Sequence, residues 1–205
     1  PFDTFEIRIT GRGAQAAQPH NSIDTIFVAA EMVSSLQTIA SRVVDTREPV
    51  VVTVTQIHAG DAWNVIPEDA VIRGTVRSFH SDVQDIAEER IARIAKGVCA
   101  AHGAECEVRY ERRYPPTVNS VKEAAQTTKV AGALVGEDNV IHDLPPTMGS
   151  EDFAFMLQVK PGSYIQIGAG DCRANLHNPN YDFNDEVLPL GTRYWVKLVE
   201  DMLGK

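Results

Sequence analysis

The sequence predicts an α+β fold in which a region of βαββαβ order, a split βαβ sandwich, precedes a region of helices with few strands. Two observations carry this prediction. Strand-like patterns occur four times before residue 115, and two long helical patterns lie between them. The stretch PPTVNS, at residues 115–120, then breaks the rhythm. We therefore expect two domains, over residues 1–115 and 116–205.

The composition excludes several classes of protein. A chain of 205 residues with 43% hydrophobic content can bury a core, and its net charge of −9 argues against a nucleic-acid partner. Apolar runs such as Val50–Val54 are far shorter than the roughly 20 residues of a membrane helix. Three cysteines, Cys99, Cys106 and Cys172, lack CxxC spacing and predict no disulfide framework. Because no signal-peptide pattern is visible, we expect a cytoplasmic protein without a membrane partner.

The first strand is already under way where the sequence starts. Phe5, Ile7 and Ile9 alternate with polar residues, and no methionine precedes them. A domain that starts in mid-strand is expected to be a piece of a longer protein. Trimming of the chain explains the same feature equally well.

The remaining elements of the first region follow from periodicity and from end signals. A helix is predicted over residues 22–44, capped by Asn21 or Ser22, with Asp24 at its positive end. Strands follow at residues 49–60 and 70–79. Ser81 and Gln84 make a capping box for a second helix, which Gly103 ends, and a fourth strand covers residues 105–114.

The second region is predicted to hold two or three helices and little sheet. Helices are expected at residues 121–135 and 188–203, the latter with Tyr194, Leu198 and Met202 on one face. Short segments are expected at NVIHDL and, as a buried strand, at GSYIQIGAG. Ser150 is expected to cap a short helix whose first turn holds Glu151 and Asp152. Such a region is too thin for a complete α/β domain, so the missing sheet must come from elsewhere.

His177, in the segment NLHNPNYDFND, has the setting of a metal ligand. Turn-forming residues such as Pro179 stiffen the loop around it, and residues 181–185 offer hydrogen-bond partners for a ligating imidazole. A catalytic zinc needs about three protein ligands, however, and the other five histidines are scattered. From spacing alone no complete metal site is encoded, and a surface or capping role for His177 stays open.

Three other places offer polar chemistry. Glu151 and Asp152 have the pattern of proton carriers, although compensation of a helix dipole explains them too. Asn64 and Arg77, read together, are able to hold a substrate carboxylate, although a solvated arginine on a sheet rim is the ordinary interpretation. The glycine turn GRGAQAAQPH is only loosely similar to anion-binding loops.

Taken in order, four segments resemble the M20 metallopeptidase family, in particular its amidohydrolase branch of hippurate hydrolases and N-acyl-amino-acid hydrolases. They are FEIRITGRGAQAAQPHNSIDTI, NVIPEDAVIRGTVRSF, TMGSEDFAFML and LHNPNYDFND. The resemblance implies a parent about twice this length, in which a βαββαβ lid or dimerisation domain interrupts an α/β catalytic domain. Residues 1–115 are then the lid, and residues 116–205 are the C-terminal part of the catalytic domain.

The resemblance also implies roles for single residues. His177 matches the last metal ligand of a site that holds Zn or Mn, two ions per site, with its other ligands upstream of Pro1. Asn64 and Arg77 match positions that bind the substrate carboxylate and, in a homodimer formed through the lid, reach the active site of the facing subunit. Glu151 matches a position to which we assign a supporting role.

Gln15 departs from the family pattern. Members usually read GxGGHAAxPH, and the histidine there stabilises the oxyanion of the tetrahedral intermediate, whereas this chain has Gln15 and keeps only the later His20. An amide donates an N–H bond but carries no charge. Loss of a charged oxyanion donor lowers a rate by roughly 10²–10³-fold.

Two functions follow as hypotheses. In the first, the parent is a di-metal amidohydrolase in which metal-activated water attacks the amide of an N-acyl amino acid, and this chain alone is inactive. In the second, the chain is a dimerisation or ligand-binding module without catalysis. Gln15 and the missing ligands favour the module, and the joint presence of His177, Asn64 and Arg77 disfavours it.

Overall fold

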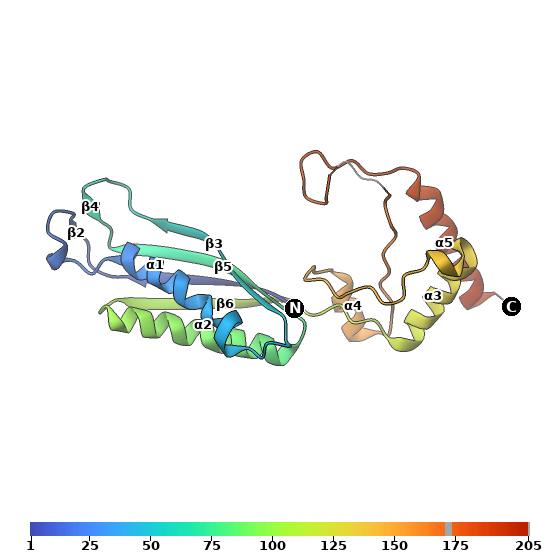
Figure 1. The fold of residues 1–205 in the computed structure, drawn as a ribbon, viewed down its shortest axis with the longest axis horizontal. Helices are drawn as coiled ribbons and strands as arrows, with labels where there is room; N and C mark the ends of the chain where they lie inside the picture. The colour runs from blue at the N-terminus through green and yellow to red at the C-terminus, as the bar shows by residue number, and fades with distance from the viewer. Residues whose placement is uncertain (171–173, 205) are drawn as a thin grey trace. The chain divides into compact units, whose positions relative to one another are not determined.

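The computed structural model describes residues 1–170 and 174–204. Contacts divide the chain into two compact units, and each is described by itself (Figure 1). The first comprises Pro1–Pro116 with Met148–Asp152, and the second comprises Thr117–Thr147 with Phe153–Lys205. That these units are a lid and part of a catalytic domain stays a prediction. Cys172 lies outside the described residues.

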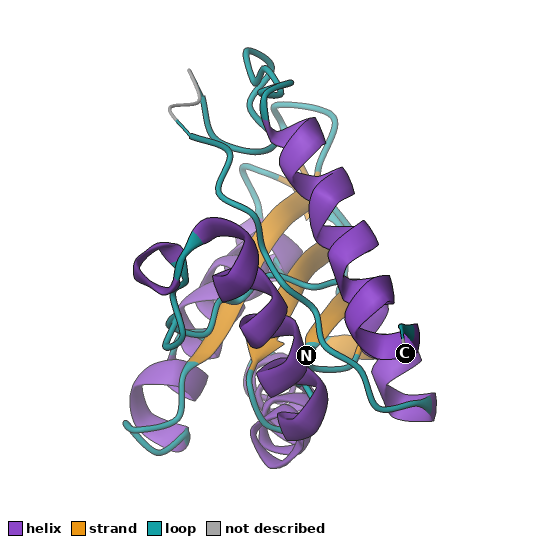
Figure 2. Ribbon diagram, turned by 90° about the vertical axis from the view of Figure 1, so that its right-hand side faces the viewer, coloured by secondary structure: helices purple, strands orange, loops and turns teal. Residues whose placement is uncertain are grey.

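The first unit is a four-stranded antiparallel sheet with both of its long helices on one face (Figures 1 and 2). The strands are β1 (Phe2–Thr10), β3 (Val50–Ala59), β5 (Asp69–Ser78) and β6 (Glu105–Tyr114), in the order β3-β5-β1-β6. The helices are α1 (Thr25–Leu36) and α2 (Ser81–Ala101). The predicted βαββαβ order is therefore confirmed. Two short strands, β2 (Ala14–Gln15) and β4 (Val65–Ile66), pair beside a 3₁₀ turn, η1 (Pro19–Asn21).

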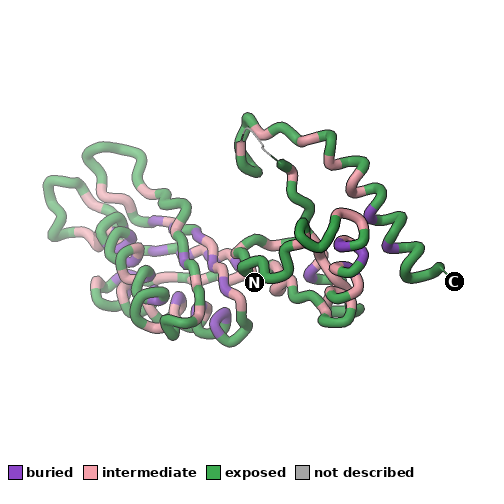
Figure 3. Tube along the Cα trace, turned by 45° about the vertical axis from the view of Figure 1, so that its right-hand side comes forward, coloured by how far each residue is buried: buried purple, intermediate pink, exposed green. Residues whose placement is uncertain are grey.

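The core lies between the sheet and the helices, and the buried stretches of the tube in Figure 3 follow it. Alternation places Phe5, Ile7 and Ile9 on the helix side of β1, where each is at most 3% exposed. Helices α1 and α2 supply Met32, Leu36, Ala87 and Ile91 from above, among others. The other side of the sheet carries charged side chains such as Arg8 and Arg73, which are exposed. The alternation of apolar and polar residues along β1 thus predicts which face of the strand is buried.

Helix α1 is shorter than predicted at both ends. Asp24 is the N-cap, since its carboxylate accepts from the N–H groups of Ile26 and Phe27 at 3.0 and 3.2 Å. Ser22 donates its hydroxyl to the Pro19 carbonyl instead, so the predicted cap was wrong. Beyond Leu36 the chain turns into η2 (Ile39–Val43), a π-helical turn.

The end of α1 has a local cause. The segment after Ser34 is rich in hydroxyl side chains, and these donate to backbone carbonyls of the preceding turn. Thr38 donates to Ser35 at 2.6 Å, and Ser41 donates to Gln37 at 3.1 Å. Such bonds compete with the regular helical ladder, which accounts for the widened turn.

The capping box predicted for α2 is absent. His80 is the N-cap residue without a side-chain cap, and Gln84 donates to both carboxylate oxygens of the buried Asp3, at 2.7 and 2.9 Å. Tyr110 donates its hydroxyl to the same carboxylate at 2.5 Å. A buried carboxylate needs such partners, and this need outweighed the local cap. Burial and the Asp3 carboxylate raise the pKa of Tyr110.

The end of α2 agrees with the prediction. Gly103 adopts φ +70° directly after the C-cap His102, as a left-handed helix terminator does. Near this end Cys99 and Cys106 are free thiols. Burial, with Cys106 beside it, raises the pKa of Cys99 to about 12, so this thiol is a poor nucleophile.

The second unit consists of helices and irregular segments. Its helices are α3 (Val121–Val135), α4 (Phe153–Val159) and α5 (Val187–Leu203), with a 3₁₀ turn, η3 (Glu137–Asn139). The expected strand GSYIQIGAG has no regular secondary structure and pairs with no strand among the described residues, and NVIHDL is irregular. The backbone of Gly162 and Tyr164 bonds instead with Asn119 and Ser120, which do not belong to a strand.

The core of this unit is small. Val130 of α3 packs with Tyr194 and Leu198 of α5, while Met202, predicted for the same face, is 57% exposed. Several large apolar side chains of α5, such as Trp195, are also exposed. None of the described helices is long and apolar enough to cross a bilayer.

Two glycines are expected to respond in opposite ways to alanine. A Cβ at Gly74, in the middle of β5, would overlap the Phe5 ring and the backbone carbonyl of Thr53, whereas Gly97, inside α2, has open space around it. We expect Gly74→Ala to destabilise the chain by about 1–3 kcal/mol through overpacking. Gly97→Ala should stabilise it by about 0.5–1 kcal/mol.

Urea unfolding followed by circular dichroism measures both changes. Gly97→Ala is the matched control, because it makes the same chemical change in the same unit. A Gly74→Ala chain as stable as the unsubstituted one would contradict the tight β1–β5 packing described above.

Candidate active site

Arg77 stands near the end of β5, between two neighbouring strands. It lies opposite Phe2 on β1 and Val51 on β3. Its guanidinium carbon is 3.9 Å from the centroid of the Phe2 ring. One terminal nitrogen, Nη1, donates to the Ser150 hydroxyl at 2.7 Å and to the Met148 carbonyl at 3.1 Å. The side chain is thus held on one face and at one nitrogen.

The charge of Arg77 is balanced differently from that of the other arginines in the sheet. Those five each have a carboxylate within ion-pair distance: Arg8, Arg73, Arg109, Arg112 and Arg113. In the described part of the chain Arg77 has no such partner. Partial burial lowers the pKa of Arg77, but a guanidinium stays protonated at neutral pH. A partly desolvated cation without a counter-charge is suited to bind a carboxylate.

Gln15 and Asn64 lie together on the β2–β4 ribbon. Gln15 is opposite Val65, and the N–H of Ala16 donates to the Asn64 carbonyl at 2.9 Å. Both candidate side chains are exposed. Trp63, which precedes Asn64, is fully exposed as well. The ribbon therefore presents an amide pair and an indole ring to solvent.

The structure does not bring Asn64 and Arg77 together within one chain. Strand β5 runs from Asp69, five residues after Asn64, to Ser78. At about 3.3 Å per residue, the eight steps from Asp69 to Arg77 span on the order of 26 Å. The length of β5 therefore contradicts the expectation that Asn64 and Arg77 of one chain hold the same carboxylate.

Glu151 lies in the segment Met148–Asp152, which packs with the first unit. Its side chain is exposed. Ser150 does not cap a helix, because α4 begins only at Phe153 and the Ser150 hydroxyl accepts from Arg77. The predicted position of Glu151 and Asp152 in the first turn of α4 was wrong for the same reason. The sequence correctly indicated a short helix here but misjudged the role of the serine.

His177 occupies a strained turn in the second unit. Among the described residues it is the one non-glycine residue with positive φ, at +66°. The turn closes with a bond from the Asn178 N–H to the Asn175 carbonyl at 3.1 Å, and the Asn178 side chain accepts from the N–H of Asn180 at 2.9 Å. Left-handed backbone at a histidine is uncommon and concentrates at functional sites.

The imidazole of His177 is exposed and makes no hydrogen bond with the described residues. Of the neighbours predicted to orient it, Asn184 donates to the Ala169 carbonyl at 3.0 Å and accepts from the N–H of Glu186. An imidazole presented in this way is suited to bind a divalent metal as one ligand of several. No group of three metal-ligating side chains is present among the described residues.

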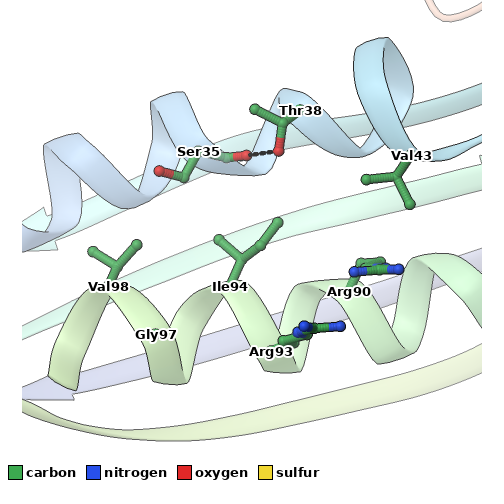
Figure 4. A pocket seen from close by; sticks show the side chains of 8 residues that line it. All are labelled: Ser35, Thr38, Val43, Arg90, Arg93, Ile94, Gly97 and Val98. Carbon is green, nitrogen blue, oxygen red and sulfur yellow. Dashed lines mark hydrogen bonds between the residues drawn. The ribbon is translucent and has the colours of Figure 1, made fainter. Parts of the chain in front are cut away.

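A shallow groove of about 400 Å³ lies elsewhere, between α1 and α2 (Figure 4). Arg90 and Arg93 line one wall, with Ser35 and Thr38 across from them. Both arginines already have the carboxylate of Glu89 within ion-pair distance, at 3.1 and 3.9 Å. None of the candidate residues lines this groove.

Three residues near the candidates escaped the sequence reasoning: Phe2, Trp63 and Ser150. The pairing of Phe2 with Arg77 was recoverable, because aligning the apolar positions of β1 and β5 gives their register. Trp63 was readable as a tryptophan in a polar loop beside Asn64. Ser150 had a competing local explanation as a cap, and nothing in the sequence alone favours its contact with Arg77.

Comparison with known proteins places the chain in a family. Residues 6–201 match Peptidase family M20/M25/M40. The chain is 34% identical to N-acetylcysteine deacetylase of Bacillus subtilis over 196 residues, which cover 96% of this chain and 50% of that protein. It is 33% identical to hippurate hydrolase of Campylobacter jejuni, again over 196 residues, covering 96% of this chain and 51% of the other.

A solved structure of the same family also matches this chain. The Bacillus subtilis YXEP protein, a dinuclear metal binding peptidase from the M20 family, matches with a TM-score of 0.74 and 29% identity, covering 98% of this chain and 50% of that one. The chain spans about half the length of the curated relatives it matches. With a family match that covers nearly all of it and relatives above 30% identity, the chain belongs to Peptidase family M20/M25/M40.

Proposed function

We propose that this chain is part of a metal-dependent amidohydrolase that cleaves the amide bond of N-acyl amino acids. In this proposal the chain supplies one metal ligand, contacts to the substrate carboxylate and a dimer interface. The observation that carries it is Arg77, a partly buried cation without a carboxylate partner among the described residues. Such a group suits an anionic substrate.

The names of the relatives support the substrate class. One is a hippurate hydrolase and one an N-acetylcysteine deacetylase. Hippurate and N-acetylcysteine are both amino acids acylated on nitrogen, and both keep a free carboxylate. A guanidinium recognises that group by two parallel N–H bonds, which also fix the orientation of the neighbouring amide. Glu151, next to Ser150 in the chain, is given a supporting role beside this contact.

His177 is proposed as the metal ligand of this chain. Its exposed imidazole, held on a strained turn, fits a site that other residues of the full-length protein complete. Bound Zn or Mn, two ions in the proposed site, supplies Lewis acidity and lowers the pKa of water. The backbone turn around His177 fixes the direction in which its side chain leaves the chain.

Gln15 and Asn64 are proposed to act across a homodimer. Asn64 precedes β5, whose span from Asp69 to Arg77 is on the order of 26 Å, so Asn64 and Arg77 contact the same substrate only when they come from different chains. In that arrangement the Gln15 amide donates an N–H to the oxygen on which charge develops. Asn64 adds a neutral donor beside it.

The two edges of the sheet support a dimer that uses β3. Six of the ten residues of β6 are charged, whereas β3 has no aspartate, glutamate, lysine or arginine. Charged edge strands resist pairing with another chain, and an uncharged β-branched edge favours it. Ile57 lies opposite the fully buried Ile72, yet it is 51% exposed, because none of the described residues covers it at the edge.

Helix α1 adds apolar surface on the same side of the sheet. Ile26 and Phe27, in its first turn, are 48% and 56% exposed. An uncharged edge strand next to an exposed apolar helix is a suitable surface for a second copy, because pairing would satisfy the free backbone groups and bury the side chains. Homodimerisation through β3 is therefore part of the proposal.

The full-length protein tests the proposed function directly. It is expected to hydrolyse N-acetyl and N-benzoyl amino acids and to lose this activity when a chelator removes its metal. His177→Asn should lower metal content, measured by plasma mass spectrometry, and reduce hydrolysis by more than roughly 100-fold, since even the outer partners of a metal site account for about 10–100-fold. Asparagine tolerates the left-handed turn, so the backbone should persist.

His142→Asn is the matched control, since His142 is also an exposed histidine of the second unit. It should leave metal content and hydrolysis unchanged. Residues 1–205 alone are expected to hydrolyse no amide. Chelator-sensitive hydrolysis by the chain alone, or full metal content in the His177→Asn protein, would contradict the proposal, and a carboxylate ligand bound without turnover by the full-length protein would favour a binding module.

Restoring a histidine at position 15 should raise the turnover rate. The imidazolium supplies a positive charge that the Gln15 amide lacks, and one oxyanion donor accounts for roughly 10²–10³-fold in kcat. We expect Gln15→His to increase kcat by at least about tenfold with little change in KM, measured by steady-state hydrolysis. Gln18→His, on the same exposed turn, is the control, and equal effects of the two substitutions would argue against the assigned position.

A lysine on β3 should separate the dimer. We expect Ile57→Lys to convert a dimer into a monomer, because it places a charge on the uncharged edge. Light scattering after size exclusion gives the mass of the unsubstituted and substituted proteins. Glu107→Lys on β6 should leave the dimer intact, and dimer loss in that variant instead would move the interface to the other edge.

A further inference from the structure

The support around Arg77 is itself informative. Phe2 lies under the guanidinium, and the Phe2 ring stacks on Tyr114 with centroids 6.0 Å apart and an interplanar angle of 25°. These two aromatic residues pair across β1 and β6. The platform beneath the cation is therefore carried by neighbouring strands of the sheet and cannot tilt freely.

The in-plane hydrogen bonds of Arg77 occupy one corner of its guanidinium. Nη1 has two N–H groups, and its two acceptors are the Ser150 hydroxyl and the Met148 carbonyl. With those bonds made and one face covered by Phe2, the fork formed by Nε and Nη2 has no acceptor among the described residues. A side-on fork of this kind matches the two oxygens of a carboxylate.

We propose that Phe2 and Ser150 are positioning residues, which hold Arg77 with its Nε and Nη2 donors presented to the carboxylate of an N-acyl amino acid. This inference rests on the proposed function and adds to it the groups that orient the contact. Holding a long side chain in the bound conformation beforehand removes an entropy cost that substrate binding would otherwise bear. Phe2 also contributes attraction to the cation itself.

A purely structural role predicts something different. In that case Arg77 would only anchor the segment Met148–Asp152 to the sheet, and its Nε and Nη2 donors would bind no ligand. Loss of Phe2 or Ser150 would lower stability and affect every substrate alike. The two roles are therefore separated by comparing substrates that differ only in their carboxylate.

The experiment uses the full-length metal-loaded enzyme and two substrates, N-benzoylglycine and its carboxamide, which share one scissile bond. Phe2→Leu and Ser150→Ala are expected to raise KM for the acid roughly tenfold, a change equivalent to about 1.4 kcal/mol, with kcat within about twofold. KM for the carboxamide should change little. Phe2→Tyr keeps the aromatic ring and Ser150→Thr keeps the hydroxyl, so both variants should retain the preference for the acid.

Ser34→Ala is the matched control, because the Ser34 hydroxyl is on the exposed side of α1 and bonds only within its helix. Thermal unfolding identifies any variant that fails to fold, and the conservative pair then decides the question. Equal changes for acid and carboxamide, or an unchanged preference for the acid, would overturn the positioning role alone. Hydrolysis of neither substrate by the unsubstituted enzyme would overturn the proposed function, and this inference with it.

Discussion

The register between β1 and β5 is the constraint on which the rest of the first unit depends. Phe5 lies opposite Gly74, and its ring fills the space that a side chain at position 74 would take. The same register places Ile7 opposite Ile72, both fully buried, and Phe2 opposite Arg77. A slip by one residue would turn every buried side chain to the open face. The core therefore holds Phe2 opposite Arg77, and a register shift between Phe2 and Asp3 in the β1–β6 pairing places Phe2 opposite Tyr114.

The candidate residues of the first unit lie at two ends of the sheet. Its rigid end carries Arg77, bounded by strands on both sides and anchored to Ser150. Its far end carries the short β2–β4 ribbon with Gln15 and Asn64, which are exposed and joined by few bonds. The strand between them is too long for one chain to use both ends on a small substrate. The proposal of a dimer therefore rests on the length of β5 as well as on the uncharged β3 edge.

The sequence predicted what depends on local periodicity and misjudged what depends on distant partners. Alternation and helical spacing identified the βαββαβ order, the bounds of α3 and the end of α2 at Gly103. The predicted helix caps were wrong where the side chain forms a hydrogen bond with a distant residue. Gln84 donates to the buried Asp3, and Ser150 accepts from Arg77. The strand GSYIQIGAG was predicted from composition, but a strand also needs a neighbouring strand, and the described residues of the second unit form none.

For the candidate site, the residue types and the pairing of Phe2 with Arg77 could be predicted from the sequence, whereas the rest of the geometry could not. The positive φ of His177 has no sequence signal, since nothing about the letters NLHNP requires a left-handed histidine. The separation of Asn64 from Arg77 follows only once β5 is known to be one uninterrupted strand. The stacking of Phe2 under Arg77 needs both the register and the rotamers.

Under the proposed function, the two ends of the sheet contribute to different parts of the free-energy profile. A contact between Arg77 and the substrate carboxylate exists before and during the reaction, so it stabilises the ground state and the transition state alike. A donor at position 15 acts on charge that is present only in the transition state, so it affects turnover. A glutamine at position 15 weakens the stabilisation of the transition state and leaves substrate binding by Arg77 intact. Positioning of Arg77 by Phe2 and Ser150 consequently remains useful in a slow enzyme, because selective binding of N-acyl amino acids does not depend on the charge that Gln15 lacks.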